Sequence, residues 1–234
     1  MATAKRPGGG LETKRDLHFF WLVDSSGSMT GQKINSLNYA IAEAIPRMRE
    51  VVLNSTNDRV LVHVVRFASE VEWMTRTPVP LSEFHWTDIQ AGGETAMGAA
   101  ISAVADKLAD LQRRQQGRYI PPVLILVTDG LPTDSNAYED SLRKLMSLEF
   151  GRKATRLAVA IGDDANFSYL QAFIANPKLS PVQAHEAEDI AALISLVSVA
   201  AIEQSSTGHS KRLETIPDDA KVPSTGGSTS WIIS

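Results

Sequence analysis

The stretch that decides the fold is residues 17–28, which read LHFFWLVDSSGS. Its first part, Leu17 to Val23, is a nearly unbroken apolar run, the pattern of a strand buried on both faces of a sheet. Similar apolar runs recur along the chain and alternate with amphipathic helical segments. This alternation predicts an α/β fold with a doubly wound, mostly parallel sheet and helices on both faces. The further expected strands are Arg59 to Phe67, Val123 to Thr128, Arg156 to Ile161 and Val182 to His185.

Apolar residues at intervals of three or four positions predict the helices. The first, residues 32–53, contains Pro46, which is expected to kink the helix or split it in two. Asn136 and Glu139 have the spacing of a capping box and predict a helix over about residues 136–149. Residues 70–74 are expected to form one short antiparallel edge strand, whereas residues 77–90 have an irregular pattern. The other expected helices are residues 97–111, 167–174 and 187–203.

Length and local composition predict one domain with a tail at each end. The 234 residues suffice for one full-sized domain, whereas two would be cramped. Residues 1–14 are rich in Gly, Pro and Lys and are expected to be flexible. Residues 15–203 form the expected domain, and the Ser-, Thr- and Gly-rich residues 204–234 are expected to be disordered. Within this tail, Trp231 to Ile233 is a small apolar patch that is either incidental or a docking element for a partner.

Composition excludes several classes of protein. The net charge of −4 and the pI near 5.7 argue against a nucleic-acid partner. The absence of cysteine removes disulfides, zinc ribbons and thiol catalysis, and fits a reducing cytosol. No apolar segment follows the basic N-terminal residues, so no signal peptide is visible. The most apolar later run, Leu193 to Ile202, is about half the ~20 residues that a membrane span needs. We therefore expect a cytoplasmic protein that does not bind membranes.

The loop after the first strand concentrates hard oxygen atoms. Asp24 supplies a carboxylate, Ser26 and Ser28 supply hydroxyls, and Gly27 lets the turn close because it has no Cβ. Such oxygens suit Mg²⁺, Mn²⁺ or Ca²⁺ rather than zinc or copper. Each residue taken singly is also a common helix cap. The loop alone therefore leaves capping and metal binding open.

Two further segments bring oxygen atoms to the same edge of the expected sheet. Thr95 precedes a helix and Asp129 follows the central strand, and ligands of parallel α/β sheets bind beyond the carboxyl ends of the strands. Two carboxylates and three hydroxyls supply most of the oxygens of an octahedral Mg²⁺ site. The charges of Asp24 and Asp129 roughly neutralise a divalent ion. The ion can then still accept an anionic oxygen from outside, for example from an Asp or Glu of a partner.

Three segments of the chain read DSSGSM (residues 24–29), GGET (residues 92–95) and TDGLPTD (residues 128–134). Together they resemble the loops of a von Willebrand factor type A domain, over about Leu17 to Glu203. In that family these loops form the metal-ion-dependent adhesion site of a Rossmann-like fold. The resemblance therefore implies a non-enzymatic, metal-dependent protein-binding module. The ligands that the resemblance implies are Ser26, Ser28 and Thr95, with Asp24 and Asp129 binding directly or through water.

Within the family, a short chain with TDGLPTD is similar to bacterial intracellular members associated with tellurite resistance and stress clusters. This similarity implies a partner such as an AAA+ ATPase, or a kinase and phosphatase encoded nearby. Some relatives carry a C-terminal zinc ribbon, and here the comparison fails because the chain contains no cysteine.

Enzyme signatures are missing from the loops. Residues 27–33 lack the spacing of a Walker A motif. Ser26 stands where an aspartate-nucleophile phosphatase needs its second Asp after Asp24, and no Gly-x-Ser-x-Gly motif surrounds Ser26 or Ser28. A bound metal can nevertheless activate water. A metal-dependent phosphoesterase that uses the same site is therefore the alternative function.

A few other polar residues have two readings each. Asp134 is expected to be a cap or turn residue, or else to support the metal ligands. Asp163 and Asp164 are expected to cap a helix, with contact to a partner as the alternative. Glu94 either hydrogen-bonds a metal-bound water or lies solvated at the rim, and His63 is expected to be a core or edge residue.

Overall fold

The apolar runs of the sequence form one sheet, which has seven strands within the described residues. The computed structural model describes residues 15–55, 59–162, 165–184 and 187–206. Five strands are parallel, in the order β2-β1-β5-β6-β7. β1 is therefore an interior strand, and its residues from Phe19 to Asp24 are all buried. The parallel strands are β1 (Asp16–Asp24), β2 (Arg59–Phe67), β5 (Val123–Thr128), β6 (Thr155–Ile161) and β7 (Val182–Ala184).

Two short strands pair antiparallel with β2. β3 (Val71–Trp73) forms the edge of the sheet, which confirms the predicted edge strand. β4 (Val79–Pro80) pairs with Leu61 and Val62, in a segment that was expected to be irregular. The expectation was wrong at these two residues because they are too few to show an alternating pattern. Pro80 also has no backbone N–H to donate to a ladder and is typical of a strand edge.

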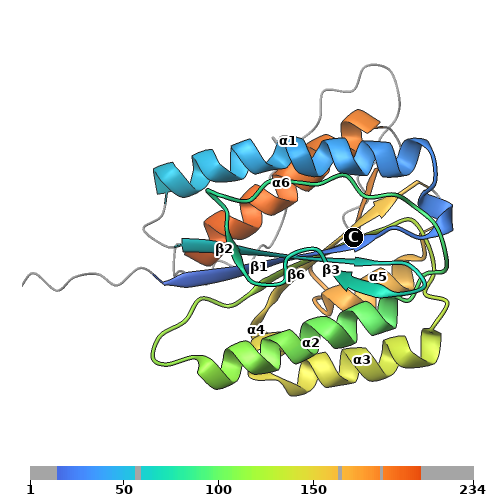
Figure 1. Cartoon of the computed structure of the whole chain (residues 1–234). Coiled ribbons are helices and arrows are strands. Elements are labelled where there is room, and N and C mark those ends of the chain that lie inside the picture. The colour runs from blue at the N-terminus through green and yellow to red at the C-terminus, as the bar shows by residue number, and fades with distance from the viewer. Residues whose placement is uncertain (1–14, 56–58, 163–164, 185–186, 207–234) are drawn as a thin grey trace, which may run out of the picture.

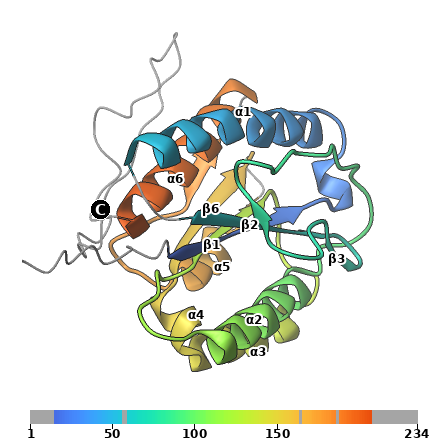
Figure 2. The same ribbon diagram turned by 60° about the vertical axis from the view of Figure 1, so that its left-hand side comes forward.

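Helices cover both faces of the sheet (Figure 1). α1 (Gln32–Ser55) and α6 (Ala187–Ser206) lie side by side on one face, and α2 (Met97–Arg114) and α3 (Ser135–Ser147) lie on the other (Figure 2). This three-layer arrangement confirms the predicted α/β class. The short helices are η1 (Gly27–Met29), α4 (Glu149–Lys153) and α5 (Phe167–Ile174).

The unbroken apolar run of β1 serves two separate cores. Phe19 and Trp21 belong to the core under α1 and α6, whereas Phe20 and Leu22 belong to the core under α2 and α5. Successive side chains of a strand point to opposite faces, so the residues on both faces of β1 must be apolar. Full burial of each such side chain contributes about 1.5–3 kcal/mol. This explains why β1 shows no alternation of polar and apolar residues.

Pro46 does not split the first helix, which runs unbroken from Gln32 to Ser55. Of the two predicted effects of Pro46, the split was therefore wrong, and the kink stays a prediction. A proline inside a helix costs about 3 kcal/mol. The same stretch buries Ile41, Ile45 and Met48 against the sheet, and each of these contributes about 1.5–3 kcal/mol. Burial of this apolar face outweighs the lost hydrogen bond.

The capping box predicted at Asn136 and Glu139 is also wrong. α3 begins one residue earlier, with Asp134 as the N-cap residue, and no side chain caps it there. The helix ends at Ser147, and the separate helix α4 follows it.

Some predictions fall outside the described residues. These are the tail over residues 1–14, most of the tail over residues 204–234 with its patch at Trp231 to Ile233, and the capping of a helix by Asp163 and Asp164. Over the described ranges, no helix combines the length and apolar character that a bilayer span requires.

His63 lies in the core, as one of its two readings predicted, and forms a pair with His18. The side chain of His63 stacks on Phe20 at a centroid distance of 4.1 Å, and its Nε2 lies 2.9 Å from His18 Nδ1. Burial is the main cause that lowers the pKa of His18 to about 4 and that of His63 to about 3. Both rings are therefore neutral in the folded protein near pH 7.

This pair predicts acid lability of the fold. The unfolded chain binds protons at these histidines below about pH 6.5, whereas the folded chain does so only near pH 4 and below. The free energy of unfolding should therefore fall as the pH drops from about 6.5 toward 4, by up to about 1.4 kcal/mol per pH unit for each histidine. Urea denaturation at a series of pH values measures it. His85→Gln is the control because His85 is exposed, and a flat wild-type profile between pH 7 and 5 would contradict the prediction.

Candidate metal centre

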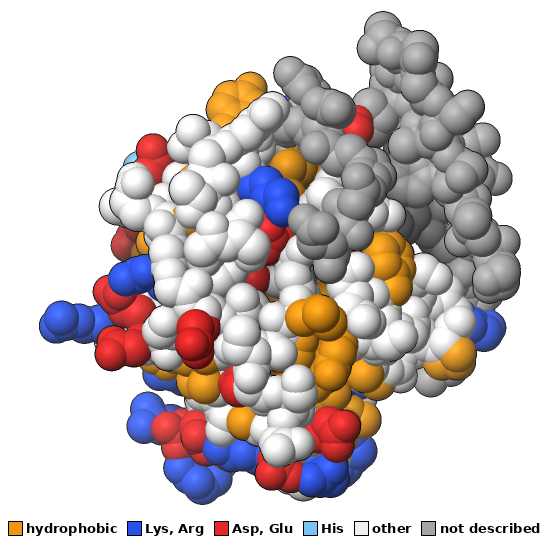
Figure 3. All heavy atoms as spheres, turned by 90° about the vertical axis from the view of Figure 1, so that its right-hand side faces the viewer, with side chains coloured by type: hydrophobic (Ala, Val, Ile, Leu, Met, Phe, Trp, Pro, Cys, Tyr) orange, Lys and Arg blue, Asp and Glu red, His pale blue; other side chains and the backbone are white. Residues whose placement is uncertain are grey.

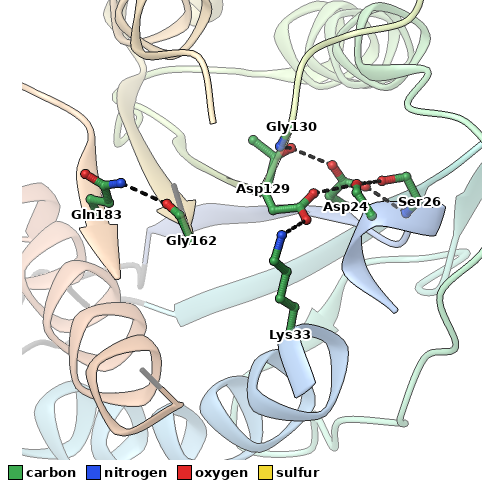
Figure 4. A network of polar contacts seen from close by, with 9 residues as sticks. Asp24, Ser26, Lys33, Asp129, Gly130, Gly162 and Gln183 are labelled. Atoms are coloured by element: carbon green, nitrogen blue, oxygen red, sulfur yellow. Dashed lines mark hydrogen bonds and ion pairs between the residues drawn. The ribbon is translucent and has the colours of Figure 1, made fainter. Parts of the chain in front are cut away.

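The three predicted loops meet beyond the carboxyl ends of β1 and β5. Asp24 is the last residue of β1, and Asp129 directly follows Thr128, the last residue of β5. The two strands are hydrogen-bonded neighbours, with Val23 opposite Val127, so their final carboxylates leave the sheet side by side (Figure 4). The parallel pairing of these strands therefore produces the predicted juxtaposition.

A chain of hydrogen bonds joins the first loop to Asp129. Ser26 Oγ and Ser28 Oγ lie 3.0 Å apart, and Ser28 Oγ donates to Asp129 Oδ1 at 2.7 Å. Oxygen ligands at about 2.0–2.1 Å from an octahedral ion lie about 2.9 Å from one another. The spacing of these three oxygens therefore fits a small, hard cation.

Thr95 is the predicted ligand of the second loop. The residue is only 6% exposed. Its backbone N–H donates to Thr133 Oγ1 at 3.3 Å, and its carbonyl accepts from Thr133 N at 3.0 Å. Within the described parts of the chain, the Thr95 hydroxyl itself makes no hydrogen bond. The hydroxyl is not among the fully buried side-chain atoms that lack a partner, so solvent reaches it and a cation could bind it.

Asp24 is wholly buried and is held by two donors. Its Oδ1 accepts from Ser26 N at 2.8 Å, and its Oδ2 accepts from Thr128 Oγ1 at 2.5 Å. Burial raises the pKa of Asp24 above its ordinary value because desolvation disfavours the charged form, and the two hydrogen bonds partly oppose this shift. A divalent cation would stabilise the ionised carboxylate. Thr128 is a supporting residue that the sequence pattern did not identify.

Backbone contacts lock the first two loops together. Gly27 N donates to Gly93 O at 2.8 Å, and Gly92 N donates to Ser25 O at 2.8 Å. Gly93 has a φ of +87°, and a Cβ there would lie 2.6 Å from Ser69 Oγ. A side chain is therefore disfavoured at Gly93, where the second loop passes Ser69. In the same loop Glu94 is exposed, which agrees with its reading as a rim residue.

Asp134 caps α2 rather than its own helix. Its Oδ1 accepts from Gly98 N at 3.0 Å, and its Oδ2 accepts from Ala99 N at 2.9 Å. These N–H groups belong to the first turn of α2, where they have no partner within the helix and where a carboxylate is favourable. The third loop thus holds the start of the helix that follows Thr95. Asp134 is therefore a positioning residue for the second loop.

Lys33 is the main residue that the sequence pattern missed. Its Nζ donates to Asp129 Oδ2 at 2.6 Å, and the side chains are 28% and 0% exposed, respectively (Figure 4). The residue lies in the first turn of α1, directly after the first loop. In the sequence alone, a lysine near the start of a helix gives no sign that it does more than face the solvent. Only the tertiary structure shows that its ammonium group reaches Asp129.

The donor set defines the kind of ion that the site can hold. Among the described residues, no group of three or more His, Cys, Asp and Glu side chains is arranged to hold a metal. The predicted ligands are instead two carboxylates and three hydroxyls, from Asp24, Asp129, Ser26, Ser28 and Thr95, and hydrogen bonds link those of Ser26, Ser28 and Asp129. An all-oxygen set of this kind fits a hard divalent cation and differs from the Cys and His ligands of structural zinc.

Comparisons with known proteins agree with the fold. The family model of the von Willebrand factor type A domain matches residues 18–199, whereas a comparison with curated proteins found no match. One similar solved structure is a von Willebrand factor type A protein from Catenulispora acidiphila, with a TM-score of 0.61 and 16% identity over 80% of this chain and 43% of that chain.

Two further solved structures are described with metal. Proximal thread matrix protein 1 from the mussel byssus, with a zinc-occupied MIDAS motif, has a TM-score of 0.60 and 17% identity over 80% of this chain and 48% of that chain. The manganese-loaded TRAP protein of Plasmodium vivax has a TM-score of 0.54 and 19% identity over 79% of this chain and 74% of that chain.

The chain spans less than half the length of the Catenulispora and mussel proteins. At these identities the structural likenesses show the fold alone. The family model, however, covers most of the sequence. The chain therefore belongs to the von Willebrand factor type A domain family.

Proposed function

We propose that this chain is a divalent-metal-dependent protein-binding module whose site binds an acidic residue of a partner. The observation that carries the proposal is the linked oxygen cluster of Ser26, Ser28 and Asp129, in which neighbouring oxygens lie 2.7–3.0 Å apart. Ser26, Ser28 and Thr95 would hold the ion through their hydroxyls, and Asp24 and Asp129 directly or through water. When bound, the ion supplies a positive charge at the end of the sheet that can accept a further oxygen ligand.

The ligand set favours recognition of an anion over a closed structural site. Hydroxyl ligands add no charge, so only Asp24 and Asp129 offset the ion. Three or four carboxylates would saturate it and remove its attraction for an external carboxylate. In the visible part of the face beyond the carboxyl ends of the strands, charged side chains gather along the α2 and α3 side and at one lateral margin (Figure 3).

The rest of the site keeps these oxygens in place. Thr128 and the backbone N–H of Ser26 hold the Asp24 carboxylate, and Asp134 holds the first turn of α2. Prearranged ligands bind with less loss of conformational freedom. We propose Mg²⁺ as the ion, with Mn²⁺ or Ca²⁺ able to replace it. The zinc-occupied mussel protein and the manganese-loaded Plasmodium protein support divalent metal use in this fold.

The partner is inferred from the chemistry of the site and from the TDGLPTD segment. We infer a protein that offers an Asp or Glu side chain, such as an AAA+ ATPase, or a kinase or phosphatase of the same gene cluster. The similarity of TDGLPTD to the corresponding segment of bacterial tellurite-resistance and stress-associated relatives supports this context. Among the described residues, no histidine contacts Ser26 or Ser28 as a base would, so the contacts favour binding over hydrolysis.

Two measurements test the proposal. Isothermal titration of the wild-type chain with Mg²⁺ and with Mn²⁺ should show binding to one site. Capture of partners on the immobilised chain should succeed with Mg²⁺, fail with EDTA, and fail with Asp24→Ala in Mg²⁺. Absence of metal binding in the titration would overturn the proposal, as would Mg²⁺-dependent phosphatase turnover that Asp129→Ala abolishes.

A further inference from the structure

We infer that Lys33 is a tethered cation that couples metal binding to carboxylate binding, and this inference rests on the proposed function. Its ammonium group lowers the affinity of the free site for a divalent ion and raises the affinity of the loaded site for an acidic partner. The observation behind it is the 2.6 Å contact between Lys33 Nζ and the fully buried Asp129 carboxylate.

The two oxygens of Asp129 have different partners. Oδ1 accepts from the hydroxyl of Ser28, a proposed ligand, and Oδ2 accepts from Lys33. Lys33 and the ion therefore act on the same carboxylate. The lysine stabilises the buried charge of Asp129 when no ion is bound, because an unpaired buried carboxylate is costly.

The fold holds the ammonium group close to the site. Lys33 extends from the first turn of α1, and its end lies beside Gly162, which follows β6. A Cβ at Gly162 would come within 3.4 Å of Lys33 Cε. A cation at the N-terminus of a helix is electrostatically unfavourable. The lysine thus does not stabilise the helix, whereas it does stabilise the Asp129 carboxylate.

The formal charges explain the coupling. Asp24, Asp129 and Lys33 together carry one negative charge. A divalent ion changes this to one positive charge, and a carboxylate from a partner then neutralises the site. Without Lys33, the loaded site would already be neutral and would attract a carboxylate less. Coupling between two ligands is reciprocal, so the factor by which the bound ion raises the affinity for a carboxylate is also the factor by which the carboxylate raises the affinity for the ion.

The test compares Lys33→Met with the wild type, using Mn²⁺ alone and Mn²⁺ with acetate. Free Mn²⁺ measured by electron paramagnetic resonance gives the affinity, and water-proton relaxation shows whether acetate displaces metal-bound water. Lys33→Met should bind Mn²⁺ roughly 10- to 100-fold more tightly, as expected when a like charge a few ångströms away is removed. Acetate should tighten Mn²⁺ binding to the wild type and have little effect on the variant.

Two controls isolate the charge at this position. Lys33→Arg keeps the charge and should behave like the wild type. Lys144→Met removes a lysine that pairs with Asp106 at 2.7 Å, away from the site, and should leave Mn²⁺ affinity unchanged. Lys33→Gln serves as a second uncharged variant if Lys33→Met does not fold.

The metal-free melting temperature provides a readout that does not depend on the ion. It should be lower in Lys33→Met than in the wild type because Asp129 loses its ion pair. Equal or weaker Mn²⁺ binding by both uncharged variants would overturn the role of Lys33 while leaving the proposed function intact. Absence of Mn²⁺ binding by the wild type would instead overturn the proposed function.

Discussion

Replacing Thr95 with alanine is expected to abolish high-affinity metal binding without destabilising the metal-free domain. The variant loses one hydroxyl ligand, and loss of even a group that only supports a ligand lowers metal affinity by about 10- to 100-fold. We therefore expect the dissociation constant for Mg²⁺ or Mn²⁺ to rise by more than roughly 100-fold. Isothermal titration measures this change.

The unchanged metal-free stability follows from the contacts of Thr95. Among the described residues, its hydroxyl has no hydrogen-bond partner, whereas its backbone N–H and carbonyl bond to Thr133 in any variant. Truncation to alanine therefore breaks no bond within the protein. Thr95→Ser keeps the hydroxyl and should retain most of the affinity. A large fall in the metal-free melting temperature of Thr95→Ala would contradict this account of the site.

Stability is expected to respond strongly to substitution of Gly98, in the first turn of α2. A Cβ there would lie 2.4 Å from Tyr138 N and 2.7 Å from the carbonyl carbon of Ala137. Both atoms belong to the backbone of α3, which cannot rotate away as a flexible side chain can. Alanine favours a helix over glycine by about 1 kcal/mol, but overpacking exceeds this gain. We expect Gly98→Ala to lower the free energy of unfolding by roughly 3 kcal/mol.

The same substitution should also reach the metal site. α2 must move away from α3, and Gly98 N donates to Asp134, which positions the second loop. Metal affinity should therefore fall together with stability. Urea denaturation and metal titration measure the two effects. Gly92→Ala is the matched control because no atom lies within 4 Å of its added Cβ. Equal stability of the two variants would show that α2 and α3 are not packed as described.

Local patterns in the sequence were sufficient to predict most of the fold. β1 is apolar on both faces, and the helices carry apolar residues at regular intervals. These patterns indicate burial because the direction of the side chains repeats regularly along a strand or a helix. The parallel sheet then brings Asp24 and Asp129 together, because adjacent parallel strands end at the same edge. Predictions failed where a local rule competed with tertiary packing. Pro46 stays inside α1 because the buried face of that helix outweighs one missing hydrogen bond.

The supporting residues of the site depend on contacts between segments that are distant in the sequence. Thr128 holds Asp24 across 104 residues, Lys33 reaches Asp129 across 96 residues, and Asp134 caps a helix about 35 residues before it. No spacing along the chain encodes such pairs.

The sequence by itself therefore determined the α/β class, the order of the three loops along the chain, and the candidate oxygen ligands. Only the tertiary structure decided which groups hold those ligands and where the ammonium group of Lys33 lies. The physical reason is that burial leaves a periodic trace in the sequence, whereas the direction of a single polar side chain depends on the atoms that the fold places around it.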